Sequence, residues 1–372
     1  MSMISSHTHL ATPDDFSDNC GFGLIAHIEG KASHDLVRTA IHSLSCMTHR
    51  GGVAADGRTG DGCGLLLATP SEFFRTIADE QGLSIGDNFA VGMVFTSLDT
   101  DKAAYSQQVL NEEILAQDLE VAGWREVPLD LSIVGDIGRE TLPGFKQVFV
   151  NAPVDSEGKN LNAEDFNRKL FVARKKAEQR LVNDELFYVC SLNCQTIIYK
   201  GLVMPSDLPA FFLDLQDNRL TSHIVVFHQR FSTNTLPRWP LAQPFRYLAH
   251  NGELNTITGN RNWSEARTPK LKSDKLPNLS ELTPLVNSTG SDSSSLDNML
   301  EVLVSGGMNL FHSMSILVPP AWQNVDSMDM DLRAFYEFYS QHMEAWDGPA
   351  GLVIQDGRYA VCMLDRNGLR PS

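Results

Sequence analysis

Short apolar runs recur along the 372-residue chain and restrict the folds that it can adopt. Runs of this length are typical of buried β-strands and are too short to cross a membrane. They occupy residues 20–28, 64–69, 88–96, 146–152, 187–192, 196–201, 223–233 and 351–365. Strands thus gather toward both ends of the sequence, and helical patterns lie between them. This distribution predicts an α+β layered fold rather than regular βαβ winding.

Two helices are predicted from their starting residues. Ser33 can cap a helix that ends at Gly51-Gly52, with Val37, Ile41 and Leu44 on its buried face. A second helix is expected to begin near Asp292, where an acidic, serine-rich start precedes apolar residues at helical spacing.

Residues from about 71 to 185 are predicted to form an insertion region, with helices over 101–118 and 164–182. Only a few residues separate the next two apolar runs, 187–192 and 196–201, and this short link predicts a hairpin between them. A second hairpin is predicted within 351–365, around an Asp-Gly turn.

The charge and the cysteines exclude several classes of protein. The formal net charge of −16 argues against a nucleic-acid surface or an anionic membrane as partner. The first 19 residues contain no Lys or Arg and no long apolar run, so they do not resemble a secretory signal. None of the six cysteines is paired at a two-residue gap, and Cys190 and Cys194 are expected to be buried thiols. Reduced thiols predict a cytoplasmic protein.

Cys20 stands directly after this polar leader. A free thiol is mostly protonated at neutral pH and needs a base to become a nucleophile. If the leader were removed, the α-amino group of Cys20 could serve as that base. Taken alone, however, Cys20 is more typical of a buried thiol.

The segment 228–263 is dense in polar, aromatic and turn residues, directly after an apolar strand. An arginine at a strand end can clamp a substrate carboxylate. A His-Asn-Gly turn can offer a side-chain amide and a backbone N–H to one oxyanion. Asp292 could pair with a substrate ammonium, or could act only as a helix cap. Together with Cys20, these groups would suit an α-amino acid with a reactive side-chain carbonyl.

Four segments carry a specific resemblance: CGFGLIA at 20–26, HRGGVAADGRTGDGCGLL at 49–66, the block at 228–256, and LDRNGLRP at 364–371. They resemble the amidotransferase domain of the glutamate synthase large subunit, over essentially the whole chain. The short core motifs resemble class II glutamine amidotransferases in general. The block from Trp239 to Trp263 and the final segment resemble glutamate synthase in particular. The fold that this family implies is a four-layer αββα sandwich of the N-terminal nucleophile hydrolase type.

The resemblance implies that Cys20 is the nucleophile and that its freed amino group is the base. It implies cleavage of the Asn19–Cys20 bond, so that residues 1–19 are a propeptide and residues 20–372 are the amidotransferase domain. Asn251 and Gly252 would form the oxyanion hole.

The resemblance also implies the substrate contacts. Arg230 would bind the glutamine α-carboxylate, helped by the loop through Phe231 and Thr233. Asp292 would hold the α-ammonium, and Arg50 would lie near the nucleophile.

The implied activity is hydrolysis of L-glutamine to glutamate and ammonia through a cysteinyl thioester. In the family, a separate synthase domain of the same chain then adds the ammonia to 2-oxoglutarate. No cofactor is expected in this fragment. The resemblance implies FMN, an iron–sulfur cluster and NADPH (or ferredoxin) for the full enzyme, with a small subunit that delivers electrons.

Two other readings stay open at this point. One is a different class II glutamine amidotransferase, and the other is a noncatalytic domain that binds glutamine or a partner. No metal site is expected, because the histidines lack ligand spacing with carboxylates. His250 adjoins the predicted oxyanion turn and could be structural. Asp56, Arg58 and Asp61 could simply order the glycine-rich loop, or they could touch the site.

Overall fold

The computed structural model describes residues 21–154, 161–229 and 237–370, which form three antiparallel sheets with helices packed against them. The first sheet has the strand order β1-β8-β2-β7, formed by Phe22–Ala26, Ile224–Gln229, Cys63–Ala68 and Thr196–Gly201. The second has the order β11-β10-β9, formed by Ala360–Leu364, Ala350–Gln355 and Leu248–Gly252. The third has the order β4-β5-β3-β6, formed by Glu120–Glu126, Gly144–Asn151, Phe89–Thr96 and Tyr188–Asn193. The predicted α+β class is confirmed.

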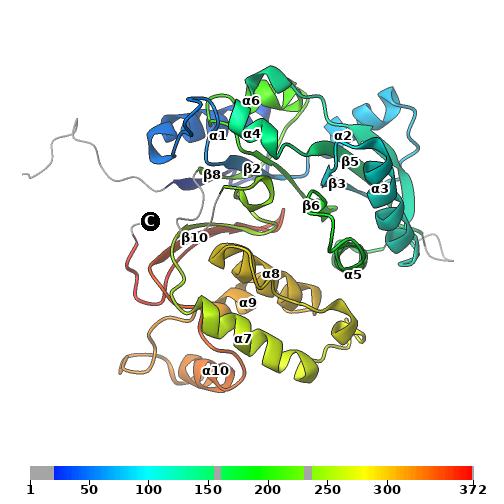
Figure 1. Cartoon of the computed structure of the whole chain (residues 1–372). Helices are drawn as coiled ribbons and strands as arrows, with labels where there is room; N and C mark the ends of the chain where they lie inside the picture. Colours follow the sequence, from blue (N-terminus) through cyan, green and yellow to red (C-terminus); the bar gives the residue numbers. More distant parts are fainter. Residues whose placement is uncertain (1–20, 155–160, 230–236, 371–372) are drawn as a thin grey trace, which may run out of the picture.

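Helix α1 (His34–Cys46) covers the first sheet (Figure 1). Its cap is Ser33, whose side chain accepts a hydrogen bond from the Leu36 N–H, as predicted. Val37 and Leu44 are fully buried in the core. The helix ends at Cys46 rather than at Gly51-Gly52, and a short 3₁₀ turn, η1 (Thr48–Arg50), fills the interval.

The end of the chain forms the predicted hairpin. Strands β10 and β11 pair antiparallel, with Gln355 opposite Ala360. The other neighbour of β10 is β9, so β9 forms an edge of this sheet. Helices α8 (Asp292–Ser305) and α9 (Leu310–Leu317) bury Leu296, Leu300 and Leu317 in the same core as Leu248 and Leu352.

The region 71–185 is not a peripheral insertion, because it supplies three strands of the third sheet and the helices packed on it. Strands are therefore spread along the chain instead of gathering at its ends. The helices of this region are α2 (Ser71–Glu80), α3 (Thr100–Leu115), α4 (Asp136–Glu140) and α5 (Ala163–Arg180). Phe166 and Leu170 of α5 pack with Val109 and Leu110 of α3 against Val148 and Val150 of the sheet.

The hairpin predicted from the runs 187–192 and 196–201 is wrong. Strand β6 pairs with β3, whereas β7 pairs with β2, so the two strands belong to different sheets. The Asn193 side chain accepts hydrogen bonds from the Gln195 and Thr196 N–H groups and turns the chain between the sheets. Both strands are largely buried, and each pairs inside a sheet with a strand from elsewhere in the sequence instead of with its sequence neighbour.

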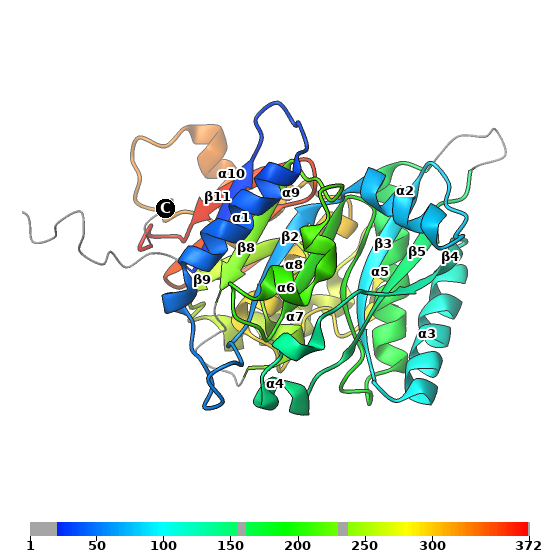
Figure 2. The same cartoon turned by 90° about the horizontal axis from the view of Figure 1, so that it is seen from above.

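The sheets and helices are stacked in layers. Figure 1 shows α1 and α6 (Leu208–Phe211) above β2 and β8, with β10 beneath them and α8 and α9 below β10. Figure 2 shows α1 and α6 in front of β8 and β2 of the first sheet, with α3 at the opposite edge of the molecule, on the right. Helices α7 (Ile257–Arg267) and α10 (Met330–Ser340) complete the lower part.

Two polar contacts tie the first sheet to the second. The Gln355 side chain donates to the Leu66 carbonyl, and His228 Nε2 donates to the His250 carbonyl over 3.0 Å. These contacts hold β9 and β10 against β2 and β8, so residues far apart in the sequence meet between the two sheets.

Candidate active site

Strand β9 carries the predicted oxyanion residues along an edge of its sheet. In an antiparallel pair, backbone groups point alternately toward the partner strand and away from it. The Glu253 N–H donates to the Pro349 carbonyl over 3.0 Å, so odd-numbered residues here face β10. Opposite Gly252, Ala350 is already engaged, because its N–H donates to the Asp365 carboxylate and its carbonyl accepts from the Asp365 N–H. The N–H groups of Leu248, His250 and Gly252 therefore point to the open edge.

Side chains satisfy the first two of these N–H groups. The Leu248 N–H donates to Asp297 Oδ1 over 3.3 Å, and the His250 N–H donates to Gln243 Oε1 over 2.8 Å. For the third, the Gly252 N–H, the described residues contribute no such acceptor. This N–H is free to bind an oxyanion placed at the open edge.

Gly252 cannot be replaced by another residue without a clash. Its φ is +140°, and a Cβ atom would lie 1.8 Å from the Pro349 carbonyl oxygen. Asn251 precedes it and is half-buried, and its side-chain amide makes no hydrogen bond within residues 21–154, 161–229 and 237–370. An amide donor and a backbone N–H donor thus stand side by side.

Asp292 lies beside the end of β9. Its Oδ2 accepts from the Leu254 N–H over 2.8 Å, two residues beyond Gly252, and its Oδ1 accepts from the Ser293 N–H. The N-cap of α8 is Ser291, whose side chain accepts from the Ser294 N–H, so capping does not account for Asp292. The structure brings Asn251, Gly252 and Asp292 together.

A second group of predicted residues meets at the end of β8. The Gln229 N–H donates to the Gly21 carbonyl over 2.6 Å, and the Gln229 side chain donates to the Thr48 carbonyl over 2.8 Å. These bonds join the residues next to Cys20 and Arg230 to the turn that contains Arg50. Cys20, Arg230, Phe231 and Thr233 themselves lie outside the described residues, as does the leader 1–19.

His228 links these two groups of residues. It pairs with Phe22 on β1, and its Nε2 donates to the carbonyl of His250, the residue before Asn251. Burial lowers the pKa of His228 to about 3, so the ring is neutral near pH 7. Burial also lowers the pKa of His250, an effect that the Asp292 carboxylate opposes and the Arg370 cation reinforces. His250 Nδ1 lies 4.0 Å from Asp292 Oδ2.

Three thiols of the described part, those of Cys63, Cys190 and Cys194, are poor nucleophiles. Burial raises the pKa of Cys63 far above its usual range, and it raises the pKa of Cys190 and of Cys194 to about 12. Cys190 is fully buried as predicted, whereas Cys194 at the β6–β7 turn is partly exposed.

The glycine-rich loop is ordered by its own acidic residues. Asp61 Oδ2 accepts from the Gly52 N–H over 2.8 Å. The Asp56 carboxylate accepts hydrogen bonds from the Thr59 hydroxyl, from the Thr59 N–H and from the Arg58 N–H, and these bonds hold its pKa below the usual range. Arg58 donates to the Ser132 carbonyl. Among the described residues, these contacts order the glycine-rich loop.

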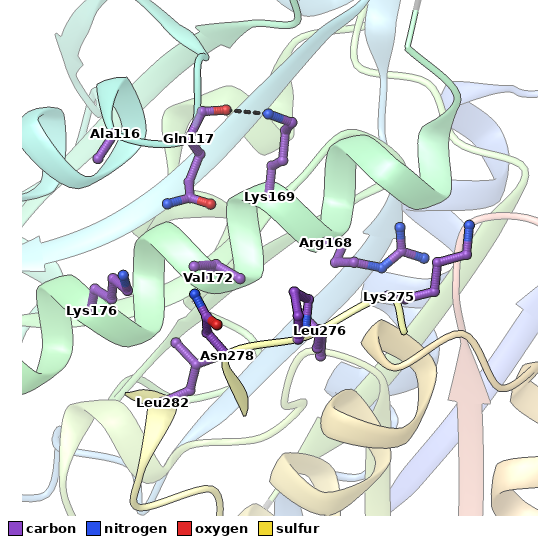
Figure 3. A pocket seen from close by; sticks show the side chains of 11 residues that line it. Ala116, Gln117, Arg168, Lys169, Val172, Lys176, Lys275, Leu276, Asn278 and Leu282 are labelled. Atoms are coloured by element: carbon purple, nitrogen blue, oxygen red, sulfur yellow. Dashed lines mark hydrogen bonds between the residues drawn. The ribbon is translucent and has the colours of Figure 1, made fainter. Parts of the chain in front are cut away.

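A separate pocket of about 390 Å³ lies between α5 and the segment 275–282 (Figure 3). It is lined by four cations: Arg168, Lys169, Lys176 and Lys275. Three of them already contact carboxylates, namely those of Asp165, Asp118 and Glu281. None of the predicted site residues lines it, and its charges are largely balanced.

Within the described ranges, no group of three His, Cys, Asp or Glu side chains could hold a metal ion. The same residues contain no helix long and apolar enough to span a membrane.

Gln243, Asp297 and His228 were not predicted as site residues. They act through long-range hydrogen bonds to the backbone of β9 and its lead-in. Gln243 and His228 lie in the segment 228–263, whose density of polar residues is the one sequence feature that could have indicated these two residues.

Residues 20–372 match the sequence family described as class-II glutamine amidotransferases. The large chain of an NADPH glutamate synthase from Bacillus subtilis is 42% identical over 365 residues, which cover 98% of this chain and 24% of that protein. Ferredoxin-dependent glutamate synthase 1 of Arabidopsis thaliana is 41% identical over 362 residues, 95% of this chain and 22% of that protein. An NADPH glutamate synthase large chain from Azospirillum brasilense is 40% identical over 366 residues. The chain spans about a quarter of the length of these relatives. Its sequence over residues 20–372 and its mixed fold with antiparallel sheets place this chain in the class-II glutamine amidotransferases.

Proposed function

We propose that this chain hydrolyses L-glutamine to glutamate and ammonia through a cysteinyl thioester formed on Cys20. One observation carries the proposal: along the open edge of β9, no acceptor from the described residues uses the Gly252 N–H, and none of them bonds the amide of the adjacent Asn251. Two such donors suit a carbonyl oxygen that gains negative charge. The backbone next to Cys20 and Arg230 meets at the neighbouring end of β8.

In the proposed mechanism, the Cys20 thiolate attacks the side-chain amide carbon of glutamine. The oxygen becomes an oxyanion held by the Asn251 amide and the Gly252 N–H. The protonated α-amino group of Cys20 gives its proton to the leaving nitrogen, and ammonia departs. Water then attacks the remaining thioester, which releases glutamate and restores the thiol.

In the same proposal, Arg230 binds the α-carboxylate of glutamine, with Phe231 and Thr233 on the same loop, and Arg50 lies near the nucleophile. Asp292 binds the α-ammonium. Its carboxylate already accepts two backbone N–H bonds, which fix its position and leave oxygen lone pairs for a substrate cation.

The proposal includes maturation. Cleavage of the Asn19–Cys20 bond would remove residues 1–19 and free the amino group that acts as base. The family match that begins at residue 20 supports this boundary. We also propose that the stacking of α1, two sheets and α8 is the αββα sandwich of the N-terminal nucleophile hydrolases, in which an N-terminal residue is the nucleophile.

We further propose that the ammonia serves glutamate synthesis from 2-oxoglutarate, in synthase domains that correspond to the part of the relatives' length that this chain does not span. FMN, an iron–sulfur cluster and an electron-delivering small subunit would belong to that part. Relatives named for NADPH and for ferredoxin are equally similar, and we propose NADPH as the donor in a cytoplasmic enzyme. Hydrolysis of glutamine itself needs only a nucleophile, a base and an oxyanion hole.

The test is ammonia release from L-glutamine, with intact mass measured on the same sample. Loss of residues 1–19 and hydrolysis of glutamine are expected together. Cys20→Ala should lower the rate by a factor on the order of 10⁴ or more. Cys46→Ala, which changes an exposed thiol on α1, is the matched control and should keep full activity. Full activity in a protein that retains Met1 would refute the N-terminal nucleophile, and glutamine binding without ammonia release would indicate a noncatalytic domain.

A further inference from the structure

The open edge of β9 is lined by side chains where a neighbouring strand would normally pair. Gln243 follows the 3₁₀ turn η4 (Trp239–Leu241) and is almost fully buried. Its Oε1 accepts from the His250 N–H over 2.8 Å, and its Nε2 donates to the His250 carbonyl over 3.3 Å. One side-chain amide thus makes both bonds that a paired strand residue would make to His250.

A second buried side chain holds the lead-in to the same strand. Asp297 lies on α8 and is fully buried. Its carboxylate accepts from the N–H groups of three successive residues, Arg246 over 3.2 Å, Tyr247 over 2.9 Å and Leu248 over 3.3 Å. Helix α8 also bears Asp292, which accepts from Leu254 just beyond the strand. The backbone of β9 is therefore held before, within and after the Asn251-Gly252 pair.

We infer that Gln243 and Asp297 are positioning residues that take the place of the missing strand on the open edge of β9 and thereby aim the Asn251 and Gly252 donors. The inference rests on the proposed glutaminase function. Gln243 acts one residue before Asn251, so a change in the orientation of the His250 backbone is passed directly to the peptide that joins His250 to Asn251. Oxyanion donors are effective only when they are fixed in place before the charge develops.

The decisive variant is Gln243→Met, which keeps the length of the side chain and removes both bonds to His250. We expect kcat for glutamine hydrolysis to fall about 10- to 100-fold, with KM changed less than about threefold, because the lost alignment affects the transition state more than the bound substrate. The assay uses the whole chain as purified after expression, without further truncation.

Gln147→Met is the matched control. Gln147 is also fully buried and also makes two side-chain hydrogen bonds, to Arg125 and to Tyr199, but it lies on β5 of the third sheet. Both variants should lower the melting temperature, whereas only Gln243→Met should lower kcat. A kcat for Gln243→Met within twofold of wild type would overturn the inference.

A double-mutant comparison with Asn251→Ala distinguishes a positioning role of Gln243 from a purely structural one, because only a positioning role makes the effect of Gln243→Met on kcat depend on Asn251. In an Asn251→Ala background, one of the two donors is already missing, so Gln243→Met should lower kcat by a clearly smaller factor than it does in the wild type. Equal factors in the two backgrounds would mean that Gln243 does not act through the Asn251 donor and would overturn that part of the inference.

Two milder variants keep the inference testable if Gln243→Met fails to fold. Gln243→Glu keeps an acceptor for the His250 N–H and loses the donor, and Asp297→Asn keeps one acceptor oxygen and loses the charge. Each should lower kcat at least about threefold with KM nearly unchanged, and unchanged kcat in both would overturn the inference. If the wild-type chain hydrolyses glutamine and Cys20→Ala is inactive, the proposed function holds, and unchanged kcat in these variants then counts against the positioning role alone. A wild-type chain without glutaminase activity would overturn both.

Discussion

Two buried polar clusters of this molecule differ in how completely they satisfy themselves. In the first, Arg125 donates to Gln147 and pairs with Asp214, Gln147 donates to Tyr199, and Tyr199 donates to Asp214. This cluster closes into a ring between the first and third sheets. No side-chain atom of the ring is among the buried atoms that lack a partner in the described part of the chain.

The second cluster surrounds β9 and remains open. His228 Nδ1, His250 Nε2 and Gln229 Oε1 are buried atoms for which residues 21–154, 161–229 and 237–370 supply no hydrogen-bond partner. The Gly252 N–H adds a donor for which the same residues supply no acceptor. Burying unsatisfied groups costs free energy, so a concentration of them beside one strand calls for an explanation. The closed ring joins the first and third sheets, whereas the open cluster is the one to which we assign a ligand and chemistry in the proposed function.

Breaking the closed ring should produce the largest effect, and only on stability. Arg125→Met leaves the Asp214 carboxylate buried without its cation, and burial already raises the pKa of Asp214. We expect a loss of about 3 to 5 kcal/mol in the free energy of unfolding, measured by chemical denaturation.

The double variant Arg125→Met/Asp214→Leu is the control, because it removes both charges and should recover most of this loss. Glutamine hydrolysis by the folded fraction should be unchanged in both proteins. If the single variant loses less than about 1 kcal/mol, the ring does not have the structural role assigned to it.

Removing a donor from the open cluster should act on the rate instead. Asn251→Ala is expected to lower kcat about 10²- to 10³-fold, or about 2.7 to 4 kcal/mol, because one of two oxyanion donors is lost. Its amide makes no hydrogen bond within the described ranges, so the free energy of unfolding should change by less than about 0.5 kcal/mol. Steady-state kinetics and denaturation of the same protein measure the two effects, and a variant that loses stability but not rate would reverse the comparison.

The smallest expected effect is the pH dependence that His228 gives to the open cluster. Burial depresses its pKa to about 3 in the folded protein, from 6.5 in the unfolded chain. A depressed pKa means that the stabilisation is fully present above pH 6.5 and is lost as the pH falls toward 3. From pH 7 to pH 5 this group should account for a loss of about 2 kcal/mol.

His228→Gln keeps a donor for the His250 carbonyl and removes the titration. Its free energy of unfolding should therefore fall less between pH 7 and pH 5 than that of the wild type, by about 2 kcal/mol. His250 remains in both proteins, so the difference reports on His228 alone. Parallel pH curves for the two proteins would contradict this account.

Much of the fold could be predicted from local patterns. The Ser33 cap, the helix that begins at Asp292 and the β10–β11 hairpin follow from residues close together in the sequence, and all three are confirmed. The hairpin predicted between residues 187–192 and 196–201 is wrong, because both strands are largely buried and pair with strands of two different sheets. Such strands pair with whichever neighbours the whole core supplies, and sequence proximity does not decide this.

The sequence by itself determined the family, because long motifs of specific residue types can be recognised without knowledge of their contacts. From the family follows the chemistry to expect around Cys20, Arg230, Asn251, Gly252 and Asp292. The tertiary structure alone decided that β9 lies at the edge of a sheet. It also decided that Gln243 and Asp297 satisfy that edge up to Gly252, whose N–H has no acceptor among the residues that the structure describes. The physical reason is that a backbone hydrogen bond carries no sequence signature. Which N–H remains free depends on partners drawn from strands, loops and helices that meet only when the chain is folded.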